Sequence, residues 1–124
     1  MTINGVEYPL RYSVLANCEL CELVEDGKGI DSLFGEQLTN TERTMNYAKT
    51  AVILNKAAKF NDAYLRGEDV DKVQSDLTVE AFMNAEYGEI VVAIGEIIST
   101  IRRGNMSAIK IRAKDKKKIN ADKE

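Results

Sequence analysis

One long stretch, from Thr39 to Gly67, constrains the fold of this chain more than any other. Thr39 and Glu42 have the spacing of a capping box, in which each side chain bonds a free backbone N–H at the start of a helix. Gly67 follows the last apolar position and can take the left-handed conformation that ends a helix. At about 1.5 Å per residue, this stretch predicts a helical rod of roughly 40 Å. In a small protein, other elements must fold along such a rod.

The central helix is expected to bury one broad apolar side. Its apolar residues recur three, four or seven positions apart, which is the period of an amphipathic helix. The members of this stripe are Tyr47, Ala51, Ile53, Leu54, Ala57, Ala58, Phe60, Tyr64 and Leu65. The opposite side carries charged residues, which predicts contact with solvent there.

Charge is divided unevenly along the chain. Residues 1–106 hold 10 basic and 17 acidic side chains, whereas residues 107–124 hold seven basic and three acidic ones. The length of 124 residues favours one domain, so we expect a helical domain over residues 1–106 and a flexible basic tail over residues 107–124.

An acidic domain lacks the clustered Lys and Arg that phosphate contacts need, so a nucleic-acid partner is not expected. No segment reaches the ~18 apolar residues that span a bilayer and no secretory leader is present, which predicts a cytoplasmic protein without membrane contact.

Cys18 and Cys21 form a single CxxC motif in a chain that has no histidine. A zinc site would need carboxylates or a second subunit, and a thioredoxin-type site would need a βαβ context. We expect both cysteines to be small apolar residues on the buried face of a helix. The nearby carboxylates Glu19, Glu22 and Glu25 lack the partners of an acid–base site and predict a solvated face. No metal ion, cofactor or catalytic residue is therefore expected.

The first residues predict a β-hairpin. Asn4-Gly5 readily adopts the positive φ angles of a two-residue turn, and short β-prone runs flank it. The second arm is expected to be the longer one, because apolar residues alternate as far as Tyr12. Pro9 marks this arm as an edge, since proline has no N–H to donate. Two strands are marginally stable alone, so the hairpin must pack on a helix.

Shorter helical segments are expected around the central helix. Ser13 is expected to cap the first of them. A short helical turn is predicted over residues 30–34, and a weak turn or ordered loop over residues 70–77. Thr78 is expected to cap another short helix. Together these patterns predict a mainly α fold in which an N-terminal β-hairpin packs on a small bundle of about four helices.

The most hydrophobic helix is expected from Tyr87 to Gly104. Its isoleucines are β-branched and unfavourable in an isolated helix, so burial must stabilise it. Gly88 and Gly95 lie within it, and because a mid-helix glycine costs about 1 kcal/mol relative to alanine, another backbone is expected to approach there, from this chain or from a second subunit. We predict an interface to a subunit or a client on this helix; the alternative is that it packs wholly against the central helix. The candidate interface residues are Tyr87, Ile90, Val91, Ile94, Gly95, Ile97, Ile98 and Ile101.

The opening INGVEYPLRYS, which leads directly into a helix of acidic and leucine-type residues, resembles the start of the tail assembly chaperones of long-tailed bacteriophages and of prophages of Gram-positive bacteria. The resemblance extends to the LFG near residue 34, the long central helix, and an LT-initiated helical C-terminal part with a charged tail. It implies a non-enzymatic protein that coats the tape measure protein in the host cytoplasm during tail assembly and is absent from the mature virion. It also implies a longer product made by frameshifting, for which the codons of Lys116-Lys117-Lys118 are a candidate site. The resemblance transfers no individual site residue.

Two other functional classes fit the residues less well. A small cytosolic adaptor or regulatory protein could contact nucleic acid through residues 110–118, where six of nine residues are basic but no aromatic residue is interleaved. A salt-sensitive gel shift that depends on the tail would favour this adaptor over a chaperone. An enzyme would need a nucleophile and a base, and the sequence offers neither a histidine nor such a pair.

Overall fold

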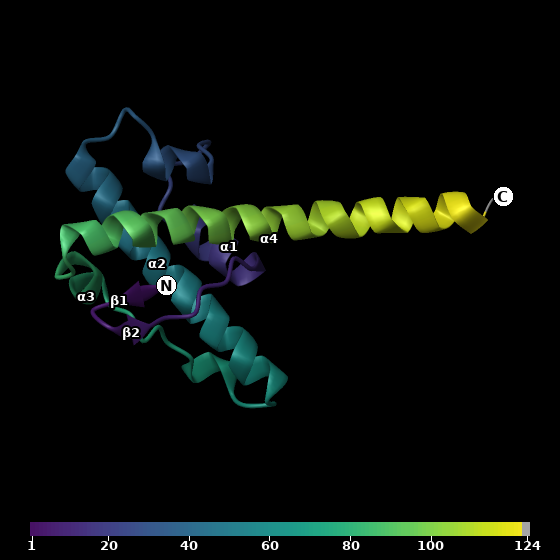
Figure 1. Cartoon of the computed structure of the whole chain (residues 1–124), viewed down its shortest axis with the longest axis horizontal. Coiled ribbons are helices and arrows are strands. Elements are labelled where there is room, and N and C mark those ends of the chain that lie inside the picture. Colours follow the sequence, from purple (N-terminus) through teal and green to yellow (C-terminus); the bar gives the residue numbers. More distant parts are fainter. Residues whose placement is uncertain (123–124) are drawn as a thin grey trace.

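The computed structural model describes the backbone of residues 1–122 and the side chains of residues 1–106. In chain order its elements are β1 (Thr2–Ile3), β2 (Val6–Glu7), α1 (Val14–Cys21), the 3-10 helix η1 (Ile30–Phe34), α2 (Asn40–Leu65), the 3-10 helix η2 (Val70–Lys72), α3 (Val79–Met83) and α4 (Tyr87–Asp122). α2 contacts α1, η1, η2, α3 and α4, and β1 packs on α4. α2 crosses α4 steeply, and the hairpin and α3 lie near the start of α4 (Figure 1). The predicted mainly α fold, with an N-terminal hairpin and a long central helix, is confirmed.

Both ends of α2 form as predicted. The Glu42 N–H donates to Thr39 Oγ1 at 3.1 Å, and the Thr39 N–H donates to Glu42 Oε1 at 3.3 Å, so the capping box is complete. Gly67 follows the helix with a φ of +73°, a conformation that favours glycine. Local interactions therefore mark where the rod begins and ends.

The core lies where α2 crosses α4. Ala51 and Leu54 of α2 and Ala93 and Ile97 of α4 are at most 1% exposed. The small alanine side chains let the two helices approach closely at the crossing. The other residues of this core are Ile3, Ala16, Ala48, Ala57, Leu77, Phe82 and Ile90.

The predicted apolar stripe of α2 is correct over the middle of the helix and wrong near its end. Tyr64 and Leu65 are 68% and 73% exposed, whereas Ala63 is 7% exposed. Because Ala63 faces the core on this last turn, the helical period turns its two larger neighbours to solvent.

The predicted hairpin is confirmed, but its second arm is not the longer one. β1 and β2 each have two residues, and Asn4 and Gly5 between them have the expected positive φ angles. The chain after β2 bonds to α2 instead of extending the hairpin. The Arg11 N–H donates to the Leu54 carbonyl oxygen at 3.0 Å, and the Pro9 carbonyl oxygen accepts from a side chain of α2. The apolar residues after β2, which were expected to extend the second strand, therefore lie against α2 and do not pair with β1.

Asn55, to which the sequence pattern assigns no role, joins three segments at the middle of α2. Its side chain is fully buried. Nδ2 donates to the Pro9 carbonyl oxygen at 2.9 Å, and Oδ1 accepts from the Asp76 N–H at 2.9 Å and from Ser75 Oγ at 3.0 Å. This one amide holds the exit of the hairpin and the segment before α3 against the central helix.

α1 presents a different face to α2 than predicted. Ser13 caps the helix as expected, accepting from the Ala16 N–H at 3.3 Å. The buried residues are Ala16 and Leu20, whereas Cys18 and Cys21 are free thiols on the surface. The prediction that both cysteines are buried is wrong, because this short helix has apolar residues on two sides and the side with Ala16 and Leu20 packs on α2.

The carboxylates of α1 also divide between two environments. Glu22 and Glu25 are exposed, as predicted. Glu19 is not part of a solvated face, since its side chain is 25% exposed and its Oε1 lies 2.6 Å from Nζ of Lys56. This ion pair links α1 to α2.

The short segments between the long helices form as predicted. η1 buries Leu33, and the ring of Phe34 stacks on Tyr47 of α2 with the ring centroids 4.4 Å apart. Thr78 caps α3 by accepting from the Ala81 N–H at 3.1 Å. η2 is the weak turn expected over residues 70–77.

α4 does not end at Gly104, as predicted, but continues to Asp122. A Cβ on Gly104 would lie 2.8 Å from both the carbonyl oxygen and Cδ1 of Tyr12, so this glycine allows close packing and does not terminate the helix. The Ala, Lys and Arg residues that follow have high helix propensity. The predicted flexible tail, with its candidate nucleic-acid and frameshift positions, lies outside the residues whose side chains the structure describes. In the described part of the chain, no helix has the length and apolar character to cross a membrane.

Candidate interaction surface

The eight residues of the predicted interface do not share one environment. Two are buried in the core, Ile90 and Ile97. Three are half-buried at its edge, Ile94, Ile98 and Ile101. Three are exposed, Tyr87, Val91 and Gly95. The predicted stripe therefore runs from the core onto the surface, and only part of it is open to a partner.

Gly88 and Gly95, two of the glycines of α4, have no close neighbour among the described residues. A Cβ built on Gly88 or on Gly95 meets no atom within 4 Å. The predicted approach of another backbone therefore does not come from the described residues of this chain. A second molecule is the remaining candidate for that approach.

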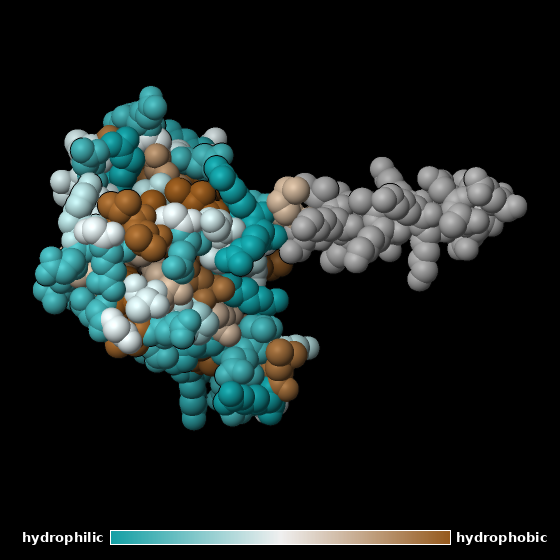
Figure 2. Space-filling model, viewed as in Figure 1, coloured by the Kyte–Doolittle hydropathy of each residue, from teal (hydrophilic) through white to brown (hydrophobic). Residues whose placement is uncertain are grey.

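One side of α4 is exposed and uncharged, and we call it the outer face. Its residues are Tyr87, Gly88, Val91, Val92, Gly95 and Ser99. Tyr87, Val91 and Val92 are 82%, 54% and 64% exposed. Apolar side chains gather over the N-terminal part of α4 in the space-filling view, and hydrophilic residues surround them (Figure 2). This patch is contiguous along the helix.

The hairpin holds the carboxylates that would otherwise add charge to this part of α4. The Asn4 N–H donates to Glu89 Oε1 at 2.6 Å. The amino group of Met1 lies 3.0 Å from Glu96 Oε2. Both acids are thereby drawn to one flank of the helix, which leaves the outer face apolar or weakly polar.

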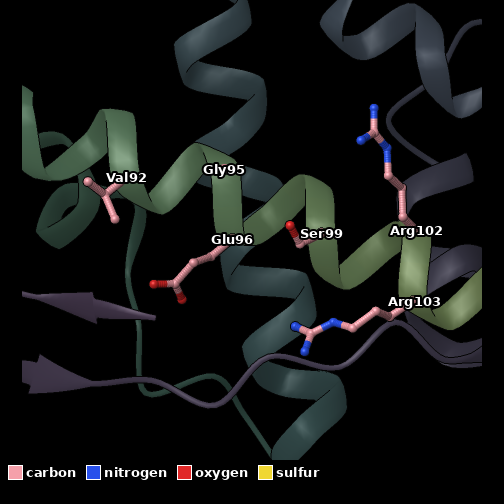
Figure 3. Close-up of a pocket in the computed structure, with 6 residues that line it drawn as sticks. All are labelled: Val92, Gly95, Glu96, Ser99, Arg102 and Arg103. Carbon is pink, nitrogen blue, oxygen red and sulfur yellow. The ribbon is translucent and has the colours of Figure 1, made fainter.

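The outer face ends at a pair of arginines. A shallow depression there is lined by Val92, Gly95, Glu96, Ser99, Arg102 and Arg103. Glu96 and Arg103 point to the hairpin side of α4, Arg102 points to the opposite side, and Gly95 and Ser99 lie between them (Figure 3). The uncharged surface is thus bounded by basic residues at its C-terminal end.

A groove adjoins the outer face, and we call it the α2–α4 groove. Two neighbouring depressions of about 380 Å³ and 290 Å³ share Thr44, Met83 and Tyr87. Their remaining lining residues are Asn40, Thr41, Arg43, Tyr47, Phe82, Ala85, Ile90 and Ile94. The groove therefore runs between the first half of α2 and the start of α4, with α3 at one end.

On the α2 side, this groove is lined by the aromatic ring of Tyr47 as well as by Arg43. Burial raises the pKa of Tyr47 above its ordinary value of 10.0, and the nearby Arg43 guanidinium opposes that shift in part. Tyr47 is therefore a neutral phenol at physiological pH. Its stacking on Phe34 fixes the ring in place.

A metal site requires several ligating side chains that lie close together. Among the described residues, no three Cys, Asp or Glu side chains lie close enough together to hold a metal ion. The groove residues Arg43, Thr44 and Met83 were not part of the predicted interface. Met83, a large apolar residue shortly before α4, is a feature of the sequence that could have indicated the groove.

Comparison of the chain with protein-family models, with curated proteins and with solved structures gives no match.

Proposed function

We propose that this chain is a tail assembly chaperone of a long-tailed bacteriophage or prophage, a non-enzymatic protein that binds the tape measure protein while the tail assembles. In this role it acts in the host cytoplasm and is absent from the mature virion. The resemblance of its opening residues to that family supports the proposal, and so does the apolar surface left open on α4.

The outer face of α4 is the observation that carries the proposal. Large apolar side chains at Tyr87, Val91 and Val92 are more than half exposed beside two glycines with free space above them. Contiguous exposed apolar surface on a small domain marks an interaction site. Gly95 lies in the interior of α4, where a glycine costs about 1 kcal/mol relative to alanine, and close contact with a partner offsets that cost. An amphipathic helix packs well on such a surface, and the family resemblance implies a long, helical tape measure protein as the client.

Co-expression with the tape measure protein encoded in the same phage genome tests the proposal. The tagged tape measure protein should stay soluble and co-purify with this chain. Val92→Asp places a charge on the outer face and should abolish the complex, whereas Val14→Asp, at an 81% exposed valine of α1, should retain it. Failure of the wild-type chain to bind any tape measure fragment would refute the function.

The same pair of variants separates client binding from self-association. Sedimentation of the chain alone reports its oligomeric state. If Val92→Asp converts an oligomer into monomers and leaves client binding intact, the outer face joins subunits and the client binds elsewhere. A tape measure gene directly downstream of this gene is the expected genomic context.

A further inference from the structure

We infer that the α2–α4 groove binds one amphipathic helix of the client, with apolar side chains on the floor of the groove and an acidic side chain paired with Arg43. This inference rests on the proposed chaperone function and adds the chemistry of the segment that the chaperone selects. It concerns the groove between the helices, which adjoins the outer face of α4.

The floor of the groove is built to accept apolar side chains. Phe82 is fully buried and Ile90 is 6% exposed, and both line the depression between α3 and α4. Met83 and Tyr87 stand at its rim, 43% and 82% exposed. The tyrosine ring offers a large apolar surface with a polar hydroxyl at its tip. The methionine side chain is flexible and its thioether is weakly polar, so it adapts to the shape of a partner. A row of leucine-type side chains on a helix fits this lining.

Arg43 is the charged residue that lines the groove, and its described partners are neutral. Its guanidinium donates to the Gly35 carbonyl oxygen at 3.5 Å and to Asn40 Oδ1. Within the described residues, no carboxylate lies within ion-pair distance of it. A partly buried guanidinium with donors to spare is a ready site for a carboxylate.

Two lysines of α2 and the arginine that follows it have the carboxylate partner that Arg43 lacks. Lys56, Lys59 and Arg66 lie 2.6 Å, 2.6 Å and 3.2 Å from carboxylate oxygens. Within the described residues, Lys49 of α2 also has no carboxylate at ion-pair distance, but among the residues that line the groove Arg43 is the charged one. The charge at the groove therefore complements an acid supplied by another molecule.

The same charge disfavours a second copy of this chain as the occupant. The apolar helix that a second copy offers is α4, whose outer face ends at Arg102. The nearest carboxylates of α4, Glu89 and Glu96, already bond to the hairpin. Docking the outer face of a second molecule would bring Arg43 an uncharged surface bounded by basic residues, and no acid of that face. An acidic client helix meets the groove without that repulsion.

A charge exchange tests the inference. Two synthetic amphipathic peptides of about 18 residues, or roughly five helical turns, share one leucine stripe and differ by Glu or Lys at the position beside it. Fluorescence anisotropy measures the Kd of each for the full chain. The wild-type chain should prefer the Glu peptide by about fivefold or more, and Arg43→Glu should reverse the preference.

Two variants control this experiment. Arg66→Glu makes the same change on an exposed arginine at the far end of α2 and should keep the preference for the Glu peptide. Tyr87→Asp should weaken both peptides, while circular dichroism shows an intact fold. Arg43→Glu places an acid in the first turns of α2, where the helix dipole favours it, so the variant should fold.

Four results would overturn the inference: no binding of either peptide, equal binding of both, a reversal by Arg66→Glu as strong as that by Arg43→Glu, or a wild-type dimer that Arg43→Glu dissociates. The last result would assign the groove to a second copy. Loss of the charge preference while the tape measure protein still co-purifies would remove this inference alone. A clear preference without tape measure binding would instead remove the proposed function.

Discussion

Replacement of Asn55 by alanine should destabilise the fold more than any other single polar-to-alanine change on α2. The side chain is fully buried and makes hydrogen bonds to two segments outside its own helix. Without it, the Pro9 carbonyl oxygen and the Asp76 N–H lose their partner at a part-buried site. Each unsatisfied buried group costs about 1 to 3 kcal/mol.

Alanine recovers part of this loss, because it favours the helix by roughly 0.6 kcal/mol over asparagine. The Leu77 N–H, a third neighbour of Asn55 Oδ1, keeps its bond to Ser75 Oγ at 3.1 Å and adds little to the cost. The net loss is therefore about 3 kcal/mol, a large share of the ~5 to 15 kcal/mol that stabilise a typical domain.

Urea denaturation followed by circular dichroism measures this loss. With a slope of about 1.5 kcal/mol per M, the midpoint should fall by roughly 2 M. Asn61→Ala makes the same change two turns later on α2, at a half-buried position, and serves as the matched control. It should change the free energy of unfolding by about 0.5 kcal/mol or less. Equal midpoints for the two variants would show that the buried amide does not organise these segments.

Three further predictions follow from burial and charge. Gly104→Ala should lower the melting temperature, because its Cβ would lie 2.8 Å from a neighbouring backbone oxygen, whereas Gly95→Ala, with free space around it, should raise the stability of the isolated chain by up to about 1 kcal/mol. The free energy of unfolding should fall as the pH rises above 10, because burial holds the pKa of Tyr47 above that of the unfolded chain and the folded phenol resists ionisation; Tyr47→Phe should lessen this fall. Both Cys18 and Cys21 should react with a thiol reagent in the native protein, and serine at either position should change stability by about 0.5 kcal/mol or less; slow reaction would contradict their exposure.

Features that depend on neighbouring residues could be predicted from the sequence. The capping box of Thr39 and Glu42, the cap at Thr78 and the turn at Asn4-Gly5 each involve side chains within a few positions of the backbone they bond. Such interactions form in the same way whatever the rest of the chain does. They set the order and the boundaries of most elements.

Features that depend on which elements meet could not be predicted in the same way. α1 has apolar residues on two sides, and only its packing on α2 decides that Leu20 is buried and Cys18 is exposed. In the sequence Asn55 is an ordinary polar residue, and its role depends on the packing of the hairpin exit and of the segment before α3 against α2. The same holds for Gly104, whose role is clear only when Tyr12 lies against it.

Which side of α4 is exposed could not be predicted from the sequence, for a related reason. Glu89 and Glu96 are charged, so the helical period alone places solvent on their side of the helix. The hairpin covers that flank and bonds both carboxylates, which moves the open side of the helix to the row that contains Val92 and Gly95. A row of small and apolar residues thus faces solvent, whereas Glu89 and Glu96 of the same helix bond to the hairpin. The hairpin therefore does more than shield the core, because its contacts with the two acids determine which surface of α4 stays open.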